Sequence, residues 1–203
     1  MNLHPEDEIL NTYNIIADNW HANRTGNDFW ADEHKKFGEF LPSGRILDIG
    51  CGSGRDSFWF VENGYEYLGI DGSASMIKLA KKNNPKARFK LKNFFELFSR
   101  GRNFDGFWAA ASLLHVPKNQ ILGLLKTIKS QIKPGGIGFI SLKEGIGEKE
   151  EVWTGTDLKR FFVYYSKDEF KSILESAGFS ILEAGTKIQN NKHMTWITFF
   201  VKV

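Results

Sequence analysis

The sequence has a single cysteine, Cys51, among its 203 residues. One thiol cannot form an internal disulfide, so a scaffold held by disulfides is excluded. Arg55 is the one basic residue near it, which gives little reason to expect a reactive thiolate. Cys51 lies within a glycine-rich turn, and we therefore expect a small residue required by space.

Long apolar runs are also missing. No stretch approaches the ~20 apolar residues that a helix needs to span a bilayer. The amino-terminal segment carries Glu6, Asp7 and Glu8 and lacks the basic and then apolar order of a signal peptide. These features predict a cytoplasmic protein without membrane contact.

Clustered charge of one sign is absent as well. Lysine and arginine number 27 against 24 acidic residues, a net charge of +3, and the lysines are dispersed without a block of five or more basic residues. A groove for nucleic acid is therefore not indicated. With 41% hydrophobic and 25% charged residues, the composition is that of a domain with one substantial core.

Apolar runs and helical patterns alternate along the chain, as a doubly wound α/β sheet requires. The helical spacing and capping residues predict helices near residues 5–20, 55–62, 73–84, 117–132 and 166–177. Strands are expected at 46–49, 67–71, 87–93, 104–110, 137–142, 179–189 and 193–203. The last two are joined by Asn190-Asn191, which predicts an antiparallel hairpin.

Residues 145–155 are rich in glycine and glutamate and are predicted to form a mobile loop. The loop follows the fifth strand, so it emerges at the edge of an open parallel sheet where ligands bind. It is interpreted either as a lid or as an exposed polar connection without function.

The main motif is residues 46–54, Ile-Leu-Asp-Ile-Gly-Cys-Gly-Ser-Gly. Its apolar start is typical of a buried strand, and its glycines let the backbone approach a ligand as it turns into a helix. Asp71 ends the next apolar run about 20 residues later, where a carboxylate can accept hydrogen bonds from both ribose hydroxyls. The pairing predicts a site for an adenosine-containing cofactor.

The spacing of the glycines separates two such cofactors. A dinucleotide fingerprint needs Gly-x-Gly-x-x-Gly, and here Arg55 occupies the last position. Asp48 adds a fixed anion that repels a pyrophosphate but suits the amino group of a methionyl moiety. S-adenosylmethionine therefore fits better than NAD, and an NAD(P)-dependent reductase is the less favoured alternative.

Residues 47–54 match, at nearly every position, the first motif of class I S-adenosylmethionine-dependent methyltransferases, and the chain resembles this family over essentially its whole length. Later landmarks follow in the family's order at residues 69–73, 104–108 and 133–136. Residues 111–117 and 160–166 are similar to a group of small, mostly microbial methyltransferases of unassigned substrate.

The resemblance implies a Rossmann-like methyltransferase fold, a seven-stranded sheet that is mostly parallel with an antiparallel C-terminal hairpin. It implies one domain over residues 1–203, with 1–44 as a helical cap over the active site and 45–203 as the core. S-adenosyl-L-methionine would be the cofactor and S-adenosyl-L-homocysteine the product. In-line methyl transfer needs alignment and exclusion of water but no metal. A non-catalytic S-adenosylmethionine-binding regulator is the other alternative.

Cofactor contacts are expected from the glycine turn, from residues after the second, third and fourth strands, and from the amino-terminal helix. Asn93 stands where many relatives have an aspartate, and its carbonyl can accept from the adenine amino group. Phe94 would stack on adenine or be buried in the core. The aromatics of the helix would close over the cofactor or pack in the core. The full set is Tyr13, Trp20, Arg24, Asp48, Gly50, Cys51, Gly52, Gly54, Asp71, Gly72, Ser73, Met76, Asn93, Phe94, Ala109 and Ala110.

His115 follows the fourth strand, near the expected position of the methyl group, and is the candidate general base. Its alternative roles are to cap the helix that begins at Pro117 or to line an apolar wall. Acceptor contacts are expected from Phe29, Trp30, His34, Arg160, Tyr164 and Tyr165, for several of which simple packing is the alternative.

The expected partner is a small-molecule methyl acceptor, with the chain acting as a monomer or homodimer. Nucleic acid is not expected, because no recognition module is appended and residues 109–112 read Ala-Ala-Ala-Ser where base-amino methyltransferases have an Asn-Pro-Pro-Tyr-like turn. The sequence does not identify the acceptor or the methylated atom.

Overall fold

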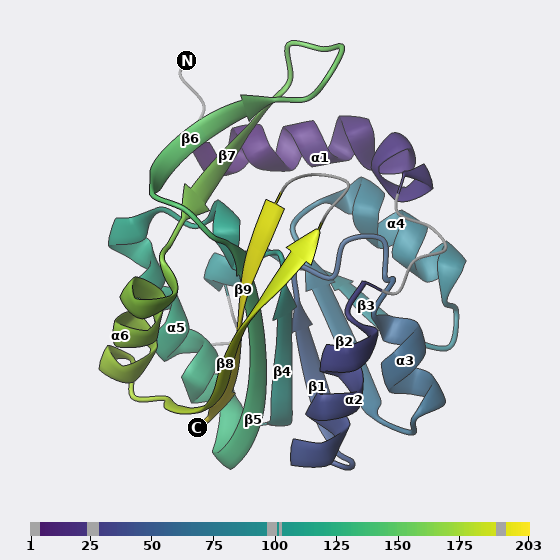
Figure 1. Cartoon of the computed structure of the whole chain (residues 1–203). Helices are drawn as coiled ribbons and strands as arrows, with labels where there is room; N and C mark the ends of the chain where they lie inside the picture. The colour runs from purple at the N-terminus through teal and green to yellow at the C-terminus, as the bar shows by residue number, and fades with distance from the viewer. Residues whose placement is uncertain (1–4, 24–28, 97–100, 102, 190–193) are drawn as a thin grey trace.

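The computed structural model describes residues 5–23, 29–96, 101, 103–189 and 194–203. These residues form a seven-stranded sheet flanked by helices, and a separate two-stranded hairpin stands above one edge of that sheet (Figure 1). The hairpin and the first helix lie at the same end of the molecule as the carboxyl ends of the parallel strands (Figure 1). This end of the sheet is where an open α/β fold binds ligands.

The large sheet has the strand order β3-β2-β1-β4-β5-β9-β8. Its strands are β1 (Arg45–Ile49), β2 (Glu66–Asp71), β3 (Arg88–Leu91), β4 (Phe104–Ala110), β5 (Ile132–Lys143), β8 (Ser180–Gln189) and β9 (Met194–Lys202). The first five are parallel, whereas β9 is antiparallel to both β5 and β8. The predicted fold class and C-terminal hairpin are therefore confirmed, and the hairpin's turn residues 190–193 lie outside the described part of the chain.

The helices are α1 (Pro5–Ala22), α2 (Ala31–Phe40), α3 (Ser57–Glu62), α4 (Ala74–Asn83), α5 (Lys118–Gln131) and α6 (Lys167–Ser176), with short 3-10 turns η1 (Phe94–Glu96) and η2 (Leu113–His115). Two predicted caps form as expected: the Ser73 hydroxyl accepts from the Met76 N–H, and that of Ser166 from the Glu169 N–H. Among the described helices, none combines the length and apolar character that crossing a bilayer requires.

The start of β5 differs from the sequence prediction. The helix before it ends at Gln131, and the strand begins at Ile132 rather than at Ile137. The pairing with β4 shifts between Phe104 and Gly106, which accommodates the extra residues as an irregularity. Gly135 permits this path with a φ of 79°, and its N–H donates to the Val203 carbonyl at 2.8 Å.

The prediction of a loop at residues 145–155 is wrong, because Gly147–Val152 forms strand β6. It pairs antiparallel with β7 (Lys159–Tyr164), which precedes α6. Lysine and glutamate side chains form ion pairs across the exposed hairpin. For example, Lys159 on β7 lies 2.9 Å from Glu150 on β6. The glycine and charge content that suggested a loop therefore belongs to a solvated hairpin.

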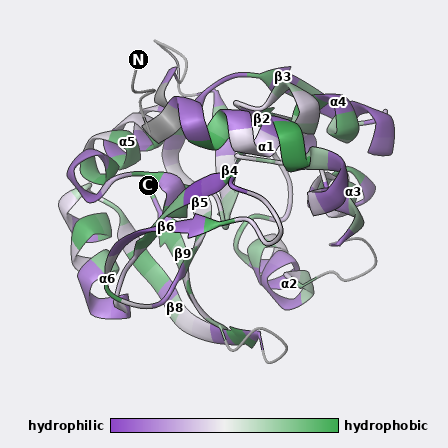
Figure 2. Ribbon diagram, turned by 90° about the horizontal axis from the view of Figure 1, so that it is seen from above, coloured by the Kyte–Doolittle hydropathy of each residue, from purple (hydrophilic) through white to green (hydrophobic). Residues whose placement is uncertain are grey.

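Apolar side chains of both the sheet and the helices form the core. Figure 2 shows the ribbon from above with each residue coloured by its hydropathy. Aromatic rings dominate the centre of the core. Trp108 on β4 is fully buried and stacks on Phe139 of β5, with 4.1 Å between ring centroids. This close packing fixes the strands that carry the site.

Candidate active site

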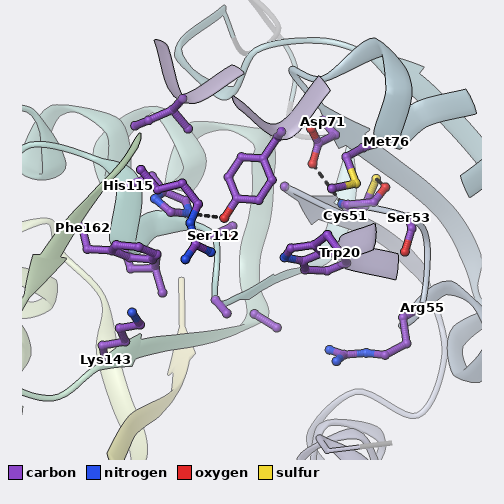
Figure 3. A pocket seen from close by; sticks show the side chains of 18 of the residues that line it. Trp20, Cys51, Ser53, Arg55, Asp71, Met76, Ser112, His115, Lys143 and Phe162 are labelled. Atoms are coloured by element: carbon purple, nitrogen blue, oxygen red, sulfur yellow. Dashed lines mark hydrogen bonds between the residues drawn. The ribbon is translucent and has the colours of Figure 1, made fainter. Parts of the chain in front are cut away.

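A cavity of about 740 Å³ opens at the carboxyl ends of β1, β2 and β4. Residues of α1 and of the β6–β7 hairpin form other parts of its wall. The close-up shows Asp71, Cys51, Met76 and Trp20 on one side and His115, Phe162 and Lys143 on the other (Figure 3). We call these the cofactor side and the acceptor side. The volume lies within the range of small-molecule sites.

The glycine turn and Asp71 form the centre of the cofactor side. The N–H groups of Gly50 and Cys51 both bond to the Ile70 carbonyl at 2.9 Å, which fixes the turn to the end of β2. The Asp71 carboxylate accepts from the Gly52 N–H at 2.9 Å and from the Ser73 N–H at 2.8 Å. Burial raises the pKa of Asp71, although these two hydrogen bonds oppose the shift. Each carboxylate oxygen keeps a lone pair for a ligand.

Two of the predicted glycines meet different demands. Gly50 lines the cavity at a φ of 72°, and a Cβ there would lie 2.5 Å from that of Ser112. Gly54, at a φ of 81°, packs instead against Phe89 and Ala80 behind the turn. It shapes the turn and does not line the cavity, which corrects its predicted role as a ligand contact.

Most of the other predicted cofactor residues also line the cavity: Tyr13, Trp20, Cys51, Gly52, Gly72, Met76, Asn93, Phe94 and Ala110. Two others do not. Ser73 is buried beneath the cavity, where it caps α4 and donates to the Asn14 side chain at 2.8 Å. Ala109 is fully buried within β4. Arg24 lies outside the described residues.

Asp48 is not the cavity-facing anion that the sequence suggested. Its carboxylate is buried behind the turn, where it accepts a 2.5 Å hydrogen bond from the Tyr67 hydroxyl. Burial, together with the negative charge of nearby Asp56, raises its pKa well above the usual range. The side chain therefore joins β1 to β2 beneath the site.

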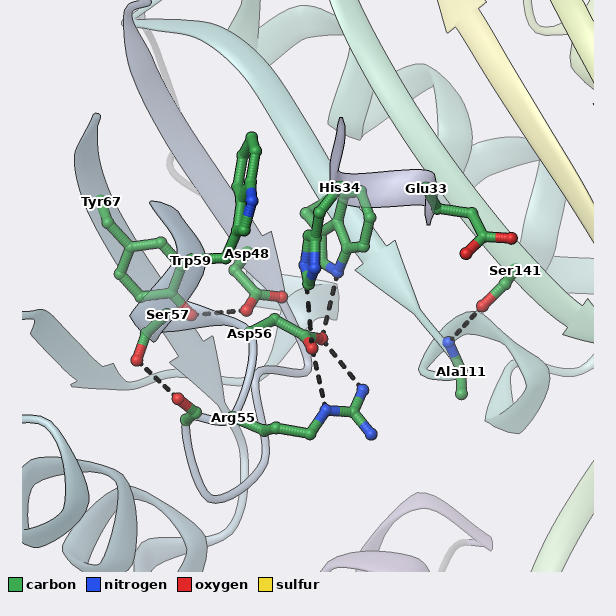
Figure 4. A network of polar contacts seen from close by, with 12 residues as sticks. Glu33, His34, Asp48, Arg55, Asp56, Ser57, Trp59, Tyr67, Ala111 and Ser141 are labelled. Atoms are coloured by element: carbon green, nitrogen blue, oxygen red, sulfur yellow. Dashed lines mark hydrogen bonds and ion pairs between the residues drawn. The ribbon is translucent and has the colours of Figure 1, made fainter. Parts of the chain in front are cut away.

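Asp56, which sequence reasoning did not identify, does line the cavity beside the glycine turn. Arg55 lies 2.9 Å from its Oδ1, the Trp108 indole N–H donates to its Oδ2 at 3.1 Å, and His34 lies 3.9 Å away (Figure 4). Burial by itself raises the pKa of Asp56, but the charge of Arg55 acts together with nearby His34 and with the hydrogen bonds from Arg55 and Trp108, and the pKa is lowered. The sequence signal that could have identified it is the Arg55-Asp56 pair directly after Gly54, the last glycine of the motif.

His34 was predicted at the acceptor, and the structure places it in the core. Its ring stacks between Trp59 and Trp108, with centroid distances of 5.1 and 4.5 Å. It lies 3.9 Å from Asp56 and is not part of the cavity wall, whereas Phe29 and Trp30 line the cavity. Figure 4 shows this buried network behind the glycine turn.

His115 lines the acceptor side with a defined proton arrangement. Its Nδ1 lies 2.6 Å from the Phe161 carbonyl, and its Nε2 lies 2.9 Å from the Tyr13 hydroxyl. Because a carbonyl only accepts, the neutral ring carries its proton on Nδ1, and Nε2 accepts from Tyr13. Burial, assisted by the positive charges of Arg160 and Lys143, lowers the pKa of His115 to about 4. The ring is therefore neutral at pH 7.

Strand alternation decides which predicted β7 residues reach the cavity. Arg160 and Phe162 line it, whereas Tyr165, which follows β7, is fully buried against Phe170 on the other side. Tyr164 shares the face of Arg160 but donates its hydroxyl to Glu151 and is not part of the cavity wall. The predicted acceptor roles of Tyr164 and Tyr165 are therefore corrected.

Comparison with known proteins gives a family and a fold. A family model described as a methyltransferase domain matches residues 20–184. A glycine N-methyltransferase of Mus musculus is 27% identical over 177 residues, 78% of this chain and 57% of that protein. An O-methyltransferase of Pyrenophora dematioidea is 26% identical over 152 residues, 70% of this chain and 56% of that protein. The chain thus spans little more than half the length of these relatives.

Among solved structures, the Burkholderia thailandensis 1,6-didemethyltoxoflavin-N1-methyltransferase, with bound 1,6-didemethyltoxoflavin and S-adenosylhomocysteine, superposes with a TM-score of 0.79. The superposition covers 100% of this chain and 91% of that one at 19% sequence identity. At this identity the similarity establishes the fold.

Proposed function

Because the chain belongs to the methyltransferase-domain family, we propose that it transfers the methyl group of S-adenosylmethionine to a small-molecule acceptor. One observation carries the proposal: the Asp71 carboxylate, fixed by two backbone N–H groups, lies beside a glycine turn in the wall of the cavity. This arrangement suits a ribose, whose two hydroxyls a carboxylate can hold.

The residues of the cofactor side fit the rest of S-adenosylmethionine. Gly52 has a φ of 53°, and a Cβ there would meet the Trp20 ring at 3.5 Å, so the ring lies close over the glycine turn at the cavity wall. Met76, Asn93 and Phe94 supply apolar surface and an amide for adenine. Asp56, held as an anion by Arg55, is the group we assign to the methionyl ammonium.

S-adenosylmethionine carries its methyl group on a sulfonium, and the thioether sulfur is a good leaving group that needs no further activation. The chain's residues then have to align the acceptor, exclude water and take up a proton. Tyr13 from α1 and the β6–β7 hairpin cover the cavity and restrict water. Neutral His115 can accept a proton at Nε2 from the Tyr13 hydroxyl that bonds to it, and both residues line the cavity.

Calorimetric titration of the chain with S-adenosylhomocysteine and, separately, with NADH tests the proposal. We expect micromolar binding of S-adenosylhomocysteine alone. Binding of NADH alone would contradict it and would favour a reductase.

Catalysis needs a second measurement, because a non-catalytic regulator would also bind the cofactor. Transfer of radiolabelled methyl from S-adenosylmethionine to a small-molecule extract, with Asp71→Ala as the control, is expected for an enzyme. Tight binding without transfer in any extract fraction would favour the regulator.

A further inference from the structure

Two cations lie over a single aromatic ring on the acceptor side. The Lys143 ammonium is 3.5 Å from the centroid of Phe162, and the Arg160 guanidinium carbon is 4.9 Å from the same centroid. Arg160 also lies over Trp153, at 4.7 Å. All four residues line the cavity. The positive charges are therefore concentrated at one place in the wall.

Glu151 balances one of these charges. Its carboxylate lies 3.2 Å from the Lys143 ammonium and accepts a hydrogen bond from the Tyr164 hydroxyl. Partial burial raises the pKa of Glu151, but the Tyr164 hydrogen bond and the charge of Lys143 outweigh it and the pKa is lowered. Glu151 is therefore ionised at neutral pH, and the pair that it makes with Lys143 has no net charge.

Among the described residues, Arg160 makes no ion pair of this kind, although it lies opposite Glu151 in the β6–β7 register and its charge contributes to the lowered pKa of that carboxyl. The Arg160 Nε atom is buried without a hydrogen-bond acceptor, and within the described part of the chain no carboxylate lies within ion-pair distance of its guanidinium. The other acids that line the cavity, Asp56 and Asp71, belong to the cofactor side, and His115 is neutral. A buried donor without an acceptor is costly, and an arginine fork matches a carboxylate or phosphate.

We propose that Arg160 binds an anionic group of the acceptor, so that the substrate is a small, flat molecule carrying a carboxylate or a phosphate. The inference rests on the proposed function, because it concerns the same cavity. Phe162 and Trp153 hold the guanidinium by its faces and leave its N–H edge for the ligand. Phe29, Trp30 and Trp196 supply apolar surface for the rest of the molecule.

The test uses the chain saturated with S-adenosylhomocysteine and three probes: phenylacetate, phenyl phosphate and the neutral phenylacetamide. Calorimetry or ligand-observed NMR measures each dissociation constant. We expect at least one anion to bind about tenfold or more tightly than the amide, since charge-assisted hydrogen bonds add this much. The carboxylate and phosphate arms show which anion the site prefers.

Arg160→Gln should remove that preference while leaving the affinity for S-adenosylhomocysteine within about threefold. Lys159→Gln is the matched control, because Lys159 is the preceding residue on β7, is exposed, and pairs with Glu150. It loses the same charge and should keep the preference.

Several results would overturn the inference: equal binding of anions and amide, no binding of either anion at millimolar concentration, or a preference that survives Arg160→Gln. Failure of the proposed function is a different result, because then S-adenosylhomocysteine itself would not bind.

Discussion

The two sides of the cavity differ in the groups that form their walls. On the cofactor side, backbone N–H groups, glycines and the Asp71 carboxylate at the ends of adjacent parallel strands form the centre of the wall. On the acceptor side, the wall consists of long side chains from α1, η2, β5 and the β6–β7 hairpin. The first side is determined by the sheet, whereas the second depends on which side chains a hairpin presents. Within this fold, we therefore expect the sheet topology to determine which cofactor binds. We expect the side chains of the hairpin, which substitutions can change, to determine which acceptor binds.

Asp71→Ala should have the largest effect and should act on the cofactor side alone. It removes two acceptor oxygens, and we expect the affinity for S-adenosylhomocysteine to fall about 100-fold or more. Calorimetry measures the loss, and circular dichroism checks the fold. Glu66→Ala at the exposed start of the same strand is the control and should leave the affinity unchanged. Retained affinity in Asp71→Ala would mean that the ribose assignment is wrong.

His115→Ala should act on the acceptor side and leave the cofactor side unchanged. Turnover is expected to fall about 100-fold, as for loss of a general base, with cofactor affinity within about threefold. Tyr13→Phe keeps the ring and removes the hydroxyl that bonds to His115, so it should lower turnover as well. Steady-state kinetics with the extract-derived acceptor measures both variants. If turnover is unchanged, His115 has no part in the mechanism.

The pH dependence of stability should report the environment of His115. Its pKa is about 4 in the folded chain, against about 6.5 when unfolded, so the unfolded chain binds more protons between these values. The free energy of unfolding should therefore fall as the pH drops from about 6.5 to 4 and should not change through this residue above 6.5. The full shift corresponds to about 3 kcal/mol, and contact with cavity water reduces our expectation to about half.

His115→Gln should flatten the pH profile of urea unfolding over this interval by that amount. Equal slopes for the variant and the unmodified chain would show that the ring is more solvated than the structure indicates.

The smallest expected effect concerns mobility. Among the described residues, strand β6 pairs with β7 alone, so half of its amides lack a partner in the sheet, whereas β5 is paired on both sides. Amides of β6 should exchange with deuterium about tenfold faster than those of β5. A lid would slow exchange across residues 144–160 when S-adenosylhomocysteine binds. No change in exchange across residues 144–160 would identify the hairpin as a fixed wall. Slower exchange on binding would then be confined to residues 50–54.

What could be predicted from sequence follows the same division. The mostly parallel doubly wound sheet with its C-terminal hairpin, the Gly50–Gly52 turn and Asp71 could be predicted because local pattern and parallel topology determine them. Lys143 and Glu151 escaped prediction because they meet only once β6 has formed, and its glycine and glutamate content resembled a loop. Asp48 and His34 were misjudged because sequence proximity to a site does not reveal which face of an element is buried.

The placement of β9 between β5 and β8 has a consequence for how the chain is made. β8 joins the sheet only through β9, and β5 has an unpaired edge until β9 is added. During synthesis, β1 to β5 leave the ribosome well before the strand that covers that edge, and exposed edges promote association between chains. Residues 194–202 thus complete the sheet late, and nascent chains that stop before them should be prone to aggregate.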